Sequence, residues 1–427
     1  MRVLLTGANG FIGRYLLTAL RDAGHEVIAA VRRPVEITRA FPRVQAIAID
    51  LNRDVTPEIW RQRVAGIDAV INCAGILQSS SAQSISAIHH AGPTALFDAC
   101  AAAGVRRVIQ ISAISADPAA RTDYAVTKRA ADDHLAALDI DWVVLRPSLV
   151  YASGSYGGTS LFRALAAFPF VIPVPGEGRQ LFQPIHIGDL AATVLRILAE
   201  PSIRRITIDP VGPEPLMLRD IVMALRRWLG LPTARVLPIP RAVVRLAARI
   251  GDLLGGPLNT TALHQMEYGN TGSVERFTAL TGLRPRSFAA ALERAPAQVQ
   301  DRWHARLYFV RPLLRFTLAT LWLGSGLVGL VVPISSSAAE LLAVASPAFR
   351  TLLVWLSCGL DIAVGVALVA RWRPRVTAGV QIGAIVTYTA ILSLLRPALW
   401  LDPFGPLLKN LPIIAAVLAL GAIENDR

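Results

Sequence analysis

The chain has 427 residues, enough for two or three domains, and its 53% hydrophobic content and positive mean hydropathy are high for a soluble protein. The formal net charge is +13, but the arginines are scattered and form no basic tail or aromatic-interleaved patch, so no nucleic-acid partner is expected. The three cysteines lack the spacing of a disulfide framework or a metal site, which fits a reducing cytosolic setting.

The first predicted strand, from Val3 to Leu5, runs directly into a glycine-rich turn and then into an apolar pattern typical of a helix. In this turn Gly7 permits the tight bend, Gly10 lets the backbone approach a pyrophosphate, and Gly13 lets the helix pack close to the strand. The amides of the first helical turn would face the anion. A dinucleotide site is therefore predicted at six residues, which are Gly7, Asn9, Gly10, Phe11, Ile12 and Gly13.

Three later strands end where a bound dinucleotide would pass. The second strand ends in Arg32 and Arg33, where NAD-preferring sites usually carry an acid, and this favours NADP(H) over NAD(H) unless both arginines are solvated loop residues. The third closes on Asp50 and Leu51, where a carboxylate can meet the adenine edge. The fourth is followed by small residues suited to contact with a cofactor, which are Cys73, Ala74 and Gly75.

Tyr124 and Lys128 are spaced i, i+4 at the start of the helix predicted after the fifth strand, so the phenol and the ammonium share one face. Lys128 is one of only two lysines among 43 basic residues, the other being Lys409, which indicates a position that arginine does not fill. A neighbouring cation lowers the pKa of a tyrosine from its usual ~10, so the pair predicts an acid–base group beside a ribose-binding ammonium. His89 and His90 project from different faces of an earlier helix without a third ligand, so no metal site is expected.

Together these motifs resemble the short-chain dehydrogenase/reductase superfamily over roughly residues 1–300. The segments from Leu145 to Tyr151 and from Gln183 to Ala191 resemble its extended or atypical branch, and Ile109 to Lys128 is most similar to the group that includes the nucleotide-binding accessory subunit of respiratory complex I. This resemblance adds three residues on the nicotinamide side of the site, which are Pro147, Ser148 and Val150.

The resemblance also implies catalytic roles. Tyr124 would be the general acid or base, Lys128 its pKa-lowering and ribose-binding partner, and Ser112 the group that polarises a substrate carbonyl. Many extended members carry two serines at this strand end with the second one catalytic, whereas this chain has Ser112 followed by Ala113. Either Ser112 or Ser115 fills the role, or the polarising group is missing, which would leave cofactor binding intact without turnover.

The expected fold class is α/β, with a doubly wound parallel Rossmann sheet and a small substrate domain, followed by an all-α four-helix transmembrane bundle. Residues 1–150 would form the NAD(P)-binding domain, 151–300 a substrate-binding region partly interleaved with it, and 301–427 the membrane domain. In the substrate region, residues 240–255 predict an amphipathic helix with arginines on one side and apolar residues opposite. Such a helix could lie on a bilayer surface or pack against its own domain.

Four transmembrane helices are predicted at about 312–333, 351–370, 376–395 and 406–423, the last of which needs a snorkelling Lys409 to reach across. Arginines precede the first helix and join the second to the third, whereas the other two connections carry few positive charges. The positive-inside rule therefore predicts a multi-pass protein of the cell (inner) membrane, with the N-terminal domain and the C-terminus in the cytoplasm.

This end of the chain resembles the DoxX-like four-helix membrane family in residues 315–326, 360–365 and 402–410. Some relatives of that family accompany quinone-linked oxidoreductases. Asp361 lies within a predicted span, where a carboxylate is either functional or paired with an arginine at the membrane edge.

The leading hypothesis is a membrane-anchored, NADP-dependent oxidoreductase that transfers hydride to or from a carbonyl or alcohol of a lipophilic substrate. The expected partners are that small molecule, the lipid bilayer and a respiratory or quinone-linked membrane complex. One alternative is a non-catalytic NADPH-binding protein that assembles or stabilises such a complex. A weaker one is a nucleotide-sugar epimerase or dehydratase, for which no nucleotide-diphosphate clamp is evident.

Overall fold

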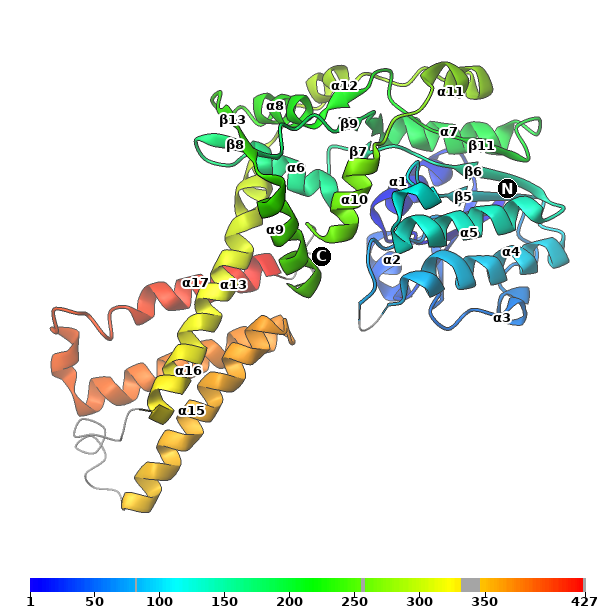
Figure 1. Ribbon diagram of the computed structural model, residues 1–427. Helices are drawn as coiled ribbons and strands as arrows, with labels where there is room; N and C mark the ends of the chain where they lie inside the picture. Colours follow the sequence, from blue (N-terminus) through cyan, green and yellow to red (C-terminus); the bar gives the residue numbers. More distant parts are fainter. Residues whose placement is uncertain (81–82, 255–257, 332–345, 425–427) are drawn as a thin grey trace. The chain divides into compact units, whose positions relative to one another are not determined.

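The computed structural model describes residues 1–80, 83–254, 258–331 and 346–424, and Figure 1 shows its helices and strands in chain order. The chain divides into two compact units, Met1–Ala305 and Arg306–Arg427. Each unit has hydrophobic clusters of its own. The predicted division at residues 150 and 300 stays a prediction.

The first unit is built on a parallel sheet of seven strands, in the order β11-β6-β5-β4-β1-β2-β3. These strands are β1 (Arg2–Thr6), β2 (Glu26–Val31), β3 (Gln45–Ala48), β4 (Ala69–Asn72), β5 (Arg107–Ile111), β6 (Asp141–Leu145) and β11 (Ile206–Ile208). Each pair of neighbours runs parallel, so every link between them is a crossover. The order reverses between β1 and β4, and doubly wound sheets bind ligands at such a switch point. The predicted Rossmann fold is confirmed.

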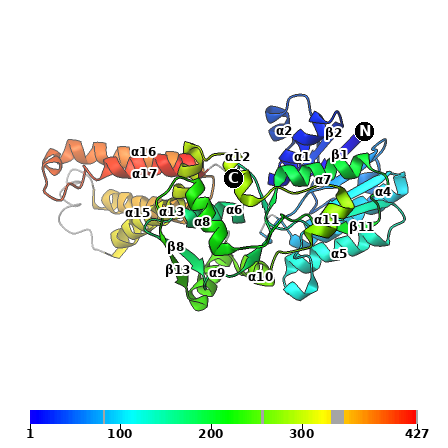
Figure 2. The ribbon, with the colours of Figure 1, turned by 90° about the horizontal axis from the view of Figure 1, so that it is seen from above.

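Helices cover both faces of this sheet. On one face, α1 (Phe11–Asp22) and α7 (Ile187–Ala199) lie next to each other, as Figure 2 shows, and share one apolar core. On the other face, α3 (Pro57–Arg61), α4 (Gly92–Ala103) and α5 (Asp123–Ala137) form a second core. Alternate β1 residues enter the two cores, which explains why the first predicted strand is apolar without alternation.

The segment after β6 builds a smaller lobe around a third core, in which Phe162, Phe182 and Ile221 are buried. Its elements are β7 (Val150–Tyr151), α6 (Gly158–Ala166), β8 (Val171–Pro175), β9 (Leu181–Phe182), β10 (Ile185–His186), β12 (Leu216–Met217), α8 (Leu218–Trp228), β13 (Arg235–Ile239) and α12 (Phe288–Arg294). In contrast, α11 (Val274–Thr281) packs on the first core through Phe277. Because α7 and β11 arise within this segment but belong to the Rossmann layers, the lobe is interleaved with the sheet domain.

The amphipathic helix predicted at 240–255 is α9 (Arg241–Leu254), and position 255 lies outside the described residues. It packs on α10 (Thr260–Tyr268) through Val244 and Ala248. The opposite apolar residues do not pack, since Val243, Leu246 and Ile250 are 53%, 60% and 49% exposed. Packing against its own domain therefore covers only a narrow strip of α9.

The second unit consists of the greater part of α13 (Val299–Val331) together with α15 (Pro347–Val369), α16 (Pro374–Leu395) and α17 (Asn410–Glu424). Among the described residues, α13, α15 and α16 are long and apolar enough to cross a membrane. The first begins well before the predicted residue 312, and its predicted end at 333 lies outside the described residues. With 15 residues, α17 is about 22 Å long at 1.5 Å per residue, short of the ~30 Å hydrocarbon layer. A fourth crossing stays a prediction.

All four helices contribute to one core. A Cβ atom on Gly326 of α13 would lie 2.9 Å from the Cys358 carbonyl oxygen of α15, so glycine lets these two helices approach closely. The carboxylate of Asp361 accepts hydrogen bonds from the hydroxyls of Ser325 (2.8 Å) and Tyr388 (3.4 Å), not from an arginine among the described residues. Of the two alternatives for Asp361, the pairing with an arginine is therefore not formed among the described residues.

Candidate nucleotide and catalytic site

The glycine-rich turn has the geometry of an anion cradle. Gly7 has a φ of +65°, and a Cβ atom there would lie 2.8 Å from the carbonyl oxygen of Cys73, so no larger residue fits. Gly10 is the extended N-cap residue of α1 and provides no side-chain cap, which leaves the first helical amides open. These amides belong to Phe11, Ile12 and Gly13, and together with the helix dipole they fit a dinucleotide pyrophosphate.

A buried polar chain fixes the turn that follows β4. The hydroxyl of Thr6 donates to Asn72, and the amide of Asn72 donates to Gln110 over 2.7 Å, which links β1, β4 and β5 at their carboxyl ends. Burial raises the pKa of Cys73 to about 12 although Lys128 opposes the shift, so the thiol stays neutral. A Cβ on Gly75 would lie 3.6 Å from Lys128 Nζ, so this predicted cofactor turn faces the predicted catalytic lysine.

Tyr124 and Lys128 are brought together as predicted. They occupy the first turns of α5, where Thr122 caps the helix by accepting from the amide of Ala125 over 3.1 Å. Lys128 Nζ lies 5.7 Å from the centre of the Tyr124 ring, is buried, and donates to the carbonyl of Ile111 over 3.2 Å. Burial lowers the pKa of Lys128. Because the carbonyl of Ile111 belongs to the last residue of β5, the carboxyl end of β5 lies beside Lys128 and forms one wall of the predicted site.

The expected effect on Tyr124 is wrong in this structure. Burial, and then the nearby Asp132 carboxylate, raise the pKa of the Tyr124 phenol instead of lowering it. Lys128 does not offset this rise in pKa, because its ammonium lies over the face of the ring and is hydrogen-bonded to the carbonyl of Ile111. The phenol is therefore a proton donor at neutral pH.

Ser112 follows β5, but its hydroxyl donates to Asp132 Oδ2 over 2.8 Å. Arg146 binds the same oxygen through Nη2 (2.9 Å) and Nε (3.0 Å), and Asp132 is only 2% exposed. Asp132 Oδ1 has no hydrogen-bond partner among the described residues. Sequence reasoning missed Asp132, although it follows Lys128 by one i, i+4 step and so shares its helix face.

His89 is a second residue that sequence reasoning considered only as a metal ligand. Its ring packs edge-on against Tyr124 with centroids 5.2 Å apart. Nε2 accepts from the amide of Ile76 over 3.0 Å, and Nδ1 lies 3.2 Å from the hydroxyl of Thr127. Since the amide can only donate, Nδ1 carries the proton. Burial is the main cause that lowers the pKa of His89 to about 2, so a neutral imidazole packs against the ring of Tyr124.

The adenine end of the site is polar but already paired. Arg33 is 80% exposed and forms an ion pair with Glu36 at 3.3 Å. The amide of Asn9 lies 3.4 Å from the same carboxylate, and Arg32 is exposed. Glu36 was not anticipated, and it sits where a 2′-phosphate would meet Arg33.

Asp50 and Leu51 are both held by local structure. Asp50 Oδ1 accepts from the amide of Asn52 over 3.1 Å, which places the carboxylate in its own turn. Leu51 is buried in the core beneath α4. Both residues therefore have structural roles.

The three residues assigned to the nicotinamide side connect the sheet to the smaller lobe. The carbonyl of Pro147 accepts from the amide of Ile114 over 3.1 Å. The hydroxyl of Ser148 donates to the carbonyl of Asn270 over 2.6 Å, and Val150 lies in β7. The hydroxyl of Ser148 is therefore already engaged.

Comparison with known proteins agrees with this geometry. Residues 3–207 match the NAD dependent epimerase/dehydratase family, and residues 319–418 match the DoxX-like family. The chain is 31% identical over 152 residues to an uncharacterized sugar epimerase of Bacillus subtilis, YhfK, covering 34% of this chain and 71% of that relative. The chain belongs to the NAD-dependent epimerase/dehydratase family. It joins that NAD(P)-binding fold to a DoxX-like domain, whose three apolar helices indicate a membrane protein.

Other relatives of this chain include oxidoreductases. Ceramide reductase of Caulobacter vibrioides is 26% identical over 262 residues, covering 61% of this chain and 80% of the relative. The 40 kDa subunit of mitochondrial NADH-ubiquinone oxidoreductase from Neurospora crassa is 22% identical over 245 residues, covering 55% and 63%. The structure of UDP-glucuronic acid 4-epimerase from Bacillus cereus, with UDP-glucuronic acid and NAD, shares the fold at a TM-score of 0.53 and 18% identity, covering 72% of this chain and 100% of that one.

Proposed function

We propose that this chain is a membrane-anchored NAD(P)H-dependent oxidoreductase that reduces a carbonyl group of a lipophilic substrate or runs the reverse reaction. The observation that carries the proposal is the position of Lys128, which lies beside Gly75 in the turn after β4 and over the ring of Tyr124, at the same sheet edge as the uncapped amides of α1. When bound, the nicotinamide would supply the hydride. The relatedness to ceramide reductase supports the same class of chemistry.

In this proposal the residues of the site have different roles. The amides of α1 hold the pyrophosphate, and Lys128 holds the ribose hydroxyls beside Gly75. Tyr124, a neutral phenol because its pKa is raised, donates its proton to the carbonyl oxygen of the substrate. Asp132 acts through Lys128 and Ser112, because its carboxylate receives the Ser112 hydroxyl and attracts the lysine.

NADP(H) is the preferred cofactor in this proposal. Arg32 and Arg33 follow β2 and present two exposed guanidinium groups at the adenine end. Glu36 competes for Arg33, so we expect Glu36→Gln to lower the KM for NADPH and Arg33→Ala to raise it, with smaller effects on NADH. Kinetics with both nucleotides measure this preference. Equal responses with the two nucleotides would contradict it.

A lipophilic substrate is favoured by α9 and α10. Gln265 of α10 donates to the hydroxyl of Thr122 over 2.7 Å, next to Tyr124, and Asp252 of α9 accepts from Gln78 over 2.8 Å. The same pair of helices leaves Leu246 60% exposed among other apolar residues. An apolar face with flanking arginines suits the surface of an anionic bilayer, from which a hydrophobic substrate would reach the site.

The arginines of the membrane unit support a cytoplasmic location of the nucleotide-binding unit. Arg371, Arg373 and Arg375 lie at the connection between α15 and α16. The positive-inside rule places this connection and the N-terminal unit in the cytoplasm, and a fourth crossing by α17 would return the C-terminus to the same side. The membrane in this proposal is the cell (inner) membrane.

A second candidate function is a nucleotide-binding accessory protein of a respiratory membrane complex. The observation that favours it is the Ser112 hydroxyl, which donates to Asp132 while Ala113 occupies the next position. The relatedness to a subunit of NADH-ubiquinone oxidoreductase agrees with this alternative. It predicts tight binding without turnover.

The test compares the full chain in detergent with Tyr124→Phe and, as a matched loss of one phenol hydroxyl, Tyr156→Phe, whose ring stacks on Phe11. We expect NADPH consumption with extracted membrane lipids in wild type and in Tyr156→Phe. In Tyr124→Phe the rate should fall about 10²–10⁴-fold while NADPH affinity is retained. Binding without consumption in all three proteins would favour the accessory role.

The membrane route has its own test in Leu246→Glu, with Ile59→Glu as a control at an exposed apolar position of α3. The new carboxylate should weaken contact with anionic vesicles and raise the KM for a membrane-embedded substrate. The KM for a short, water-soluble carbonyl compound should not change. Equal effects of both variants would contradict the route.

A further inference from the structure

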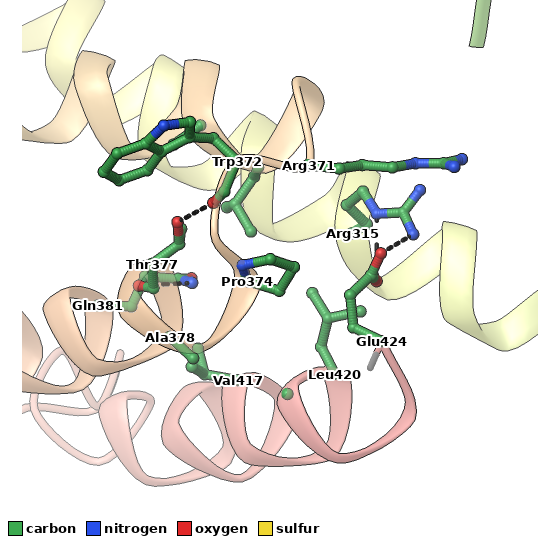
Figure 3. A pocket seen from close by; sticks show the side chains of 13 residues that line it. Arg315, Arg371, Trp372, Pro374, Thr377, Ala378, Gln381, Val417, Leu420 and Glu424 are labelled. Carbon is green, nitrogen blue, oxygen red and sulfur yellow. Dashed lines mark hydrogen bonds and ion pairs between the residues drawn. The ribbon is translucent and has the colours of Figure 1, made fainter. Parts of the chain in front are cut away.

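The membrane unit contains a pocket of about 330 Å³ that is partly open to solvent, bordered by α13, α15, α16, α17 and the connection between α15 and α16 (Figure 3). One wall is apolar, with Leu368, Val417 and Leu420. The other carries charged groups from Arg315, Arg371 and Glu424. A cavity with one charged and one apolar wall suits an amphiphile better than a purely polar or apolar ligand.

Two of these charges neutralise each other. Arg315 forms a bidentate ion pair with Glu424, in which Nε lies 3.3 Å from Oε2 and Nη2 contacts Oε1. Their side chains are only 5% and 10% exposed, so the pair is held within the helix bundle. This pair uses the only acidic side chain among the described residues that line the pocket.

Arg371 is left as a surplus charge. Its guanidinium makes no hydrogen bond or ion pair with any residue in the described part of the chain. Figure 3 shows its guanidinium on the same side as that of Arg315. Partial burial and repulsion from Arg315 and Arg311 lower the pKa of Arg371, and the Glu424 carboxylate opposes this shift. Arg371 is exposed at the mouth of the pocket, which therefore carries net positive charge.

The surroundings identify the class of anion. Trp372 borders the same mouth, and tryptophan is enriched at the level of lipid headgroups. Arginines between transmembrane helices on the cytoplasmic side commonly bind phospholipid headgroups. The apolar wall continues from this mouth along α15 and α17, where an acyl chain would lie.

We propose that this pocket binds the phosphate ester of an anionic phospholipid, with Arg371 as its main ionic contact and Val417 and Leu420 against the adjoining hydrocarbon. The phosphate takes the position that compensates Arg371, while Arg315 stays paired with Glu424. The site does not depend on the reaction proposed for the first unit.

The test is native mass spectrometry of the delipidated full chain with dioleoylphosphatidylglycerol, dioleoylphosphatidylcholine or glycerol phosphate. We expect phosphatidylglycerol to bind about tenfold more tightly than phosphatidylcholine, because only the former adds an uncompensated charge. Arg371→Gln should remove this preference. Arg373→Gln is the matched control, since it removes one charge from the same connection but from a side chain that lies over the Trp372 ring at 5.3 Å.

Two further variants keep the proposal falsifiable if Arg371→Gln is unstable. Arg371→Lys should retain most of the preference, and Glu424→Gln should increase affinity for phosphatidylglycerol because a competing carboxylate is removed. Equal losses in Arg371→Gln and Arg373→Gln would show a general basic surface and overturn the site. Displacement of the lipid by equimolar glycerol phosphate would show that a free phosphate ester, not a lipid, is the occupant.

Discussion

The two units of the chain differ in the side chains that they expose, although both bury an apolar core. In the first unit, apolar residues such as Leu16, Ile71 and Phe97 are fully buried on the two faces of the sheet. In the second, Trp355 and Leu356 are each 61% exposed, whereas Gln381, Asp361 and Arg315 are almost fully buried. In water such exposed apolar surface would favour aggregation, whereas in a bilayer it faces the lipid hydrocarbon.

This difference teaches where to look for function in each unit. In the first, functional polar groups gather at the carboxyl edge of the sheet, where backbone amides and short turns meet. In the second, polar groups are the exception inside the bundle, so each buried one marks a contact between helices or a binding position. The predictions below test whether the two units depend on these different features.

The largest effect is expected for Gly13→Ala. A Cβ there would lie 2.9 Å from the Cα of Ala8 and even closer to the Gly7 carbonyl, so the turn must open. Because the opened turn no longer presents the amides of α1 to the pyrophosphate, NADPH affinity in a fluorescence titration should fall about 100-fold or more. Gly104→Ala is the control, because its φ of +70° adds strain but no atom lies within 4 Å. Unchanged affinity in Gly13→Ala would contradict the cradle.

A smaller effect on kcat should distinguish the role of Asp132 from that of Ser112. We expect Asp132→Asn to lower kcat about 10–100-fold and to change its pH profile, because Lys128 loses its nearest carboxylate. Ser112→Ala should lower kcat less than about threefold, since its hydroxyl donates to Asp132 and not into the site. A 100-fold loss in Ser112→Ala alone would instead establish this serine as the group that polarises the carbonyl.

The raised pKa of Tyr124 predicts opposite pH profiles for the two directions of the reaction. Reduction needs the protonated phenol, so its rate should stay flat up to about pH 9, below the usual tyrosine pKa of ~10. Oxidation needs the phenolate, so its rate should rise about tenfold per pH unit over the same range without a plateau. A plateau near neutral pH would show that Lys128 lowers the pKa in the working enzyme.

The smallest effect is expected in the membrane unit. Gln381 accepts a hydrogen bond from Trp322 Nε1 over 3.0 Å, linking α16 to α13. Gln381→Leu should cost about 0.5–1.5 kcal/mol of stability in detergent, as is typical of hydrogen bonds between transmembrane helices. The Tm of the full chain, with exposed Val386→Leu as the control, measures it. A loss several times larger would mean that this unit depends on its polar core as strongly as a water-soluble domain does.

Local patterns predicted most of the fold. The apolar strands, the glycine turn and the spacing of Tyr124 and Lys128 are consecutive or one helical turn apart, so the sequence displays them directly. The helices of the membrane unit follow from apolar runs, of which the second is interrupted by Asp361. However, α13 extends further toward the N-terminus than its apolar part, and α17 begins at Asn410, four residues after the predicted start.

The missing parts of the site depend on contacts between distant segments. The role of Asp132 depends on Ser112 and Arg146, which follow β5 and β6 and bind its carboxylate. The direction of the Ser112 hydroxyl cannot be read from a strand ending in serine. Similarly, the exposure of Leu246 depends on which strip of α9 meets α10, and an amphipathic pattern alone left both readings open.

The measurement that tests the central claim most directly follows deuterium from the transferable position of NADPH. The full chain is incubated with labelled NADPH and the lipids of its own membrane, and the products are examined by mass spectrometry. The account predicts deuterium on the carbinol carbon of a lipid in wild type, and none with Tyr124→Phe at equal NADPH occupancy. If both proteins bind NADPH and neither releases the label to any product, the chain holds a structural nucleotide and the account of Tyr124 as proton donor is contradicted.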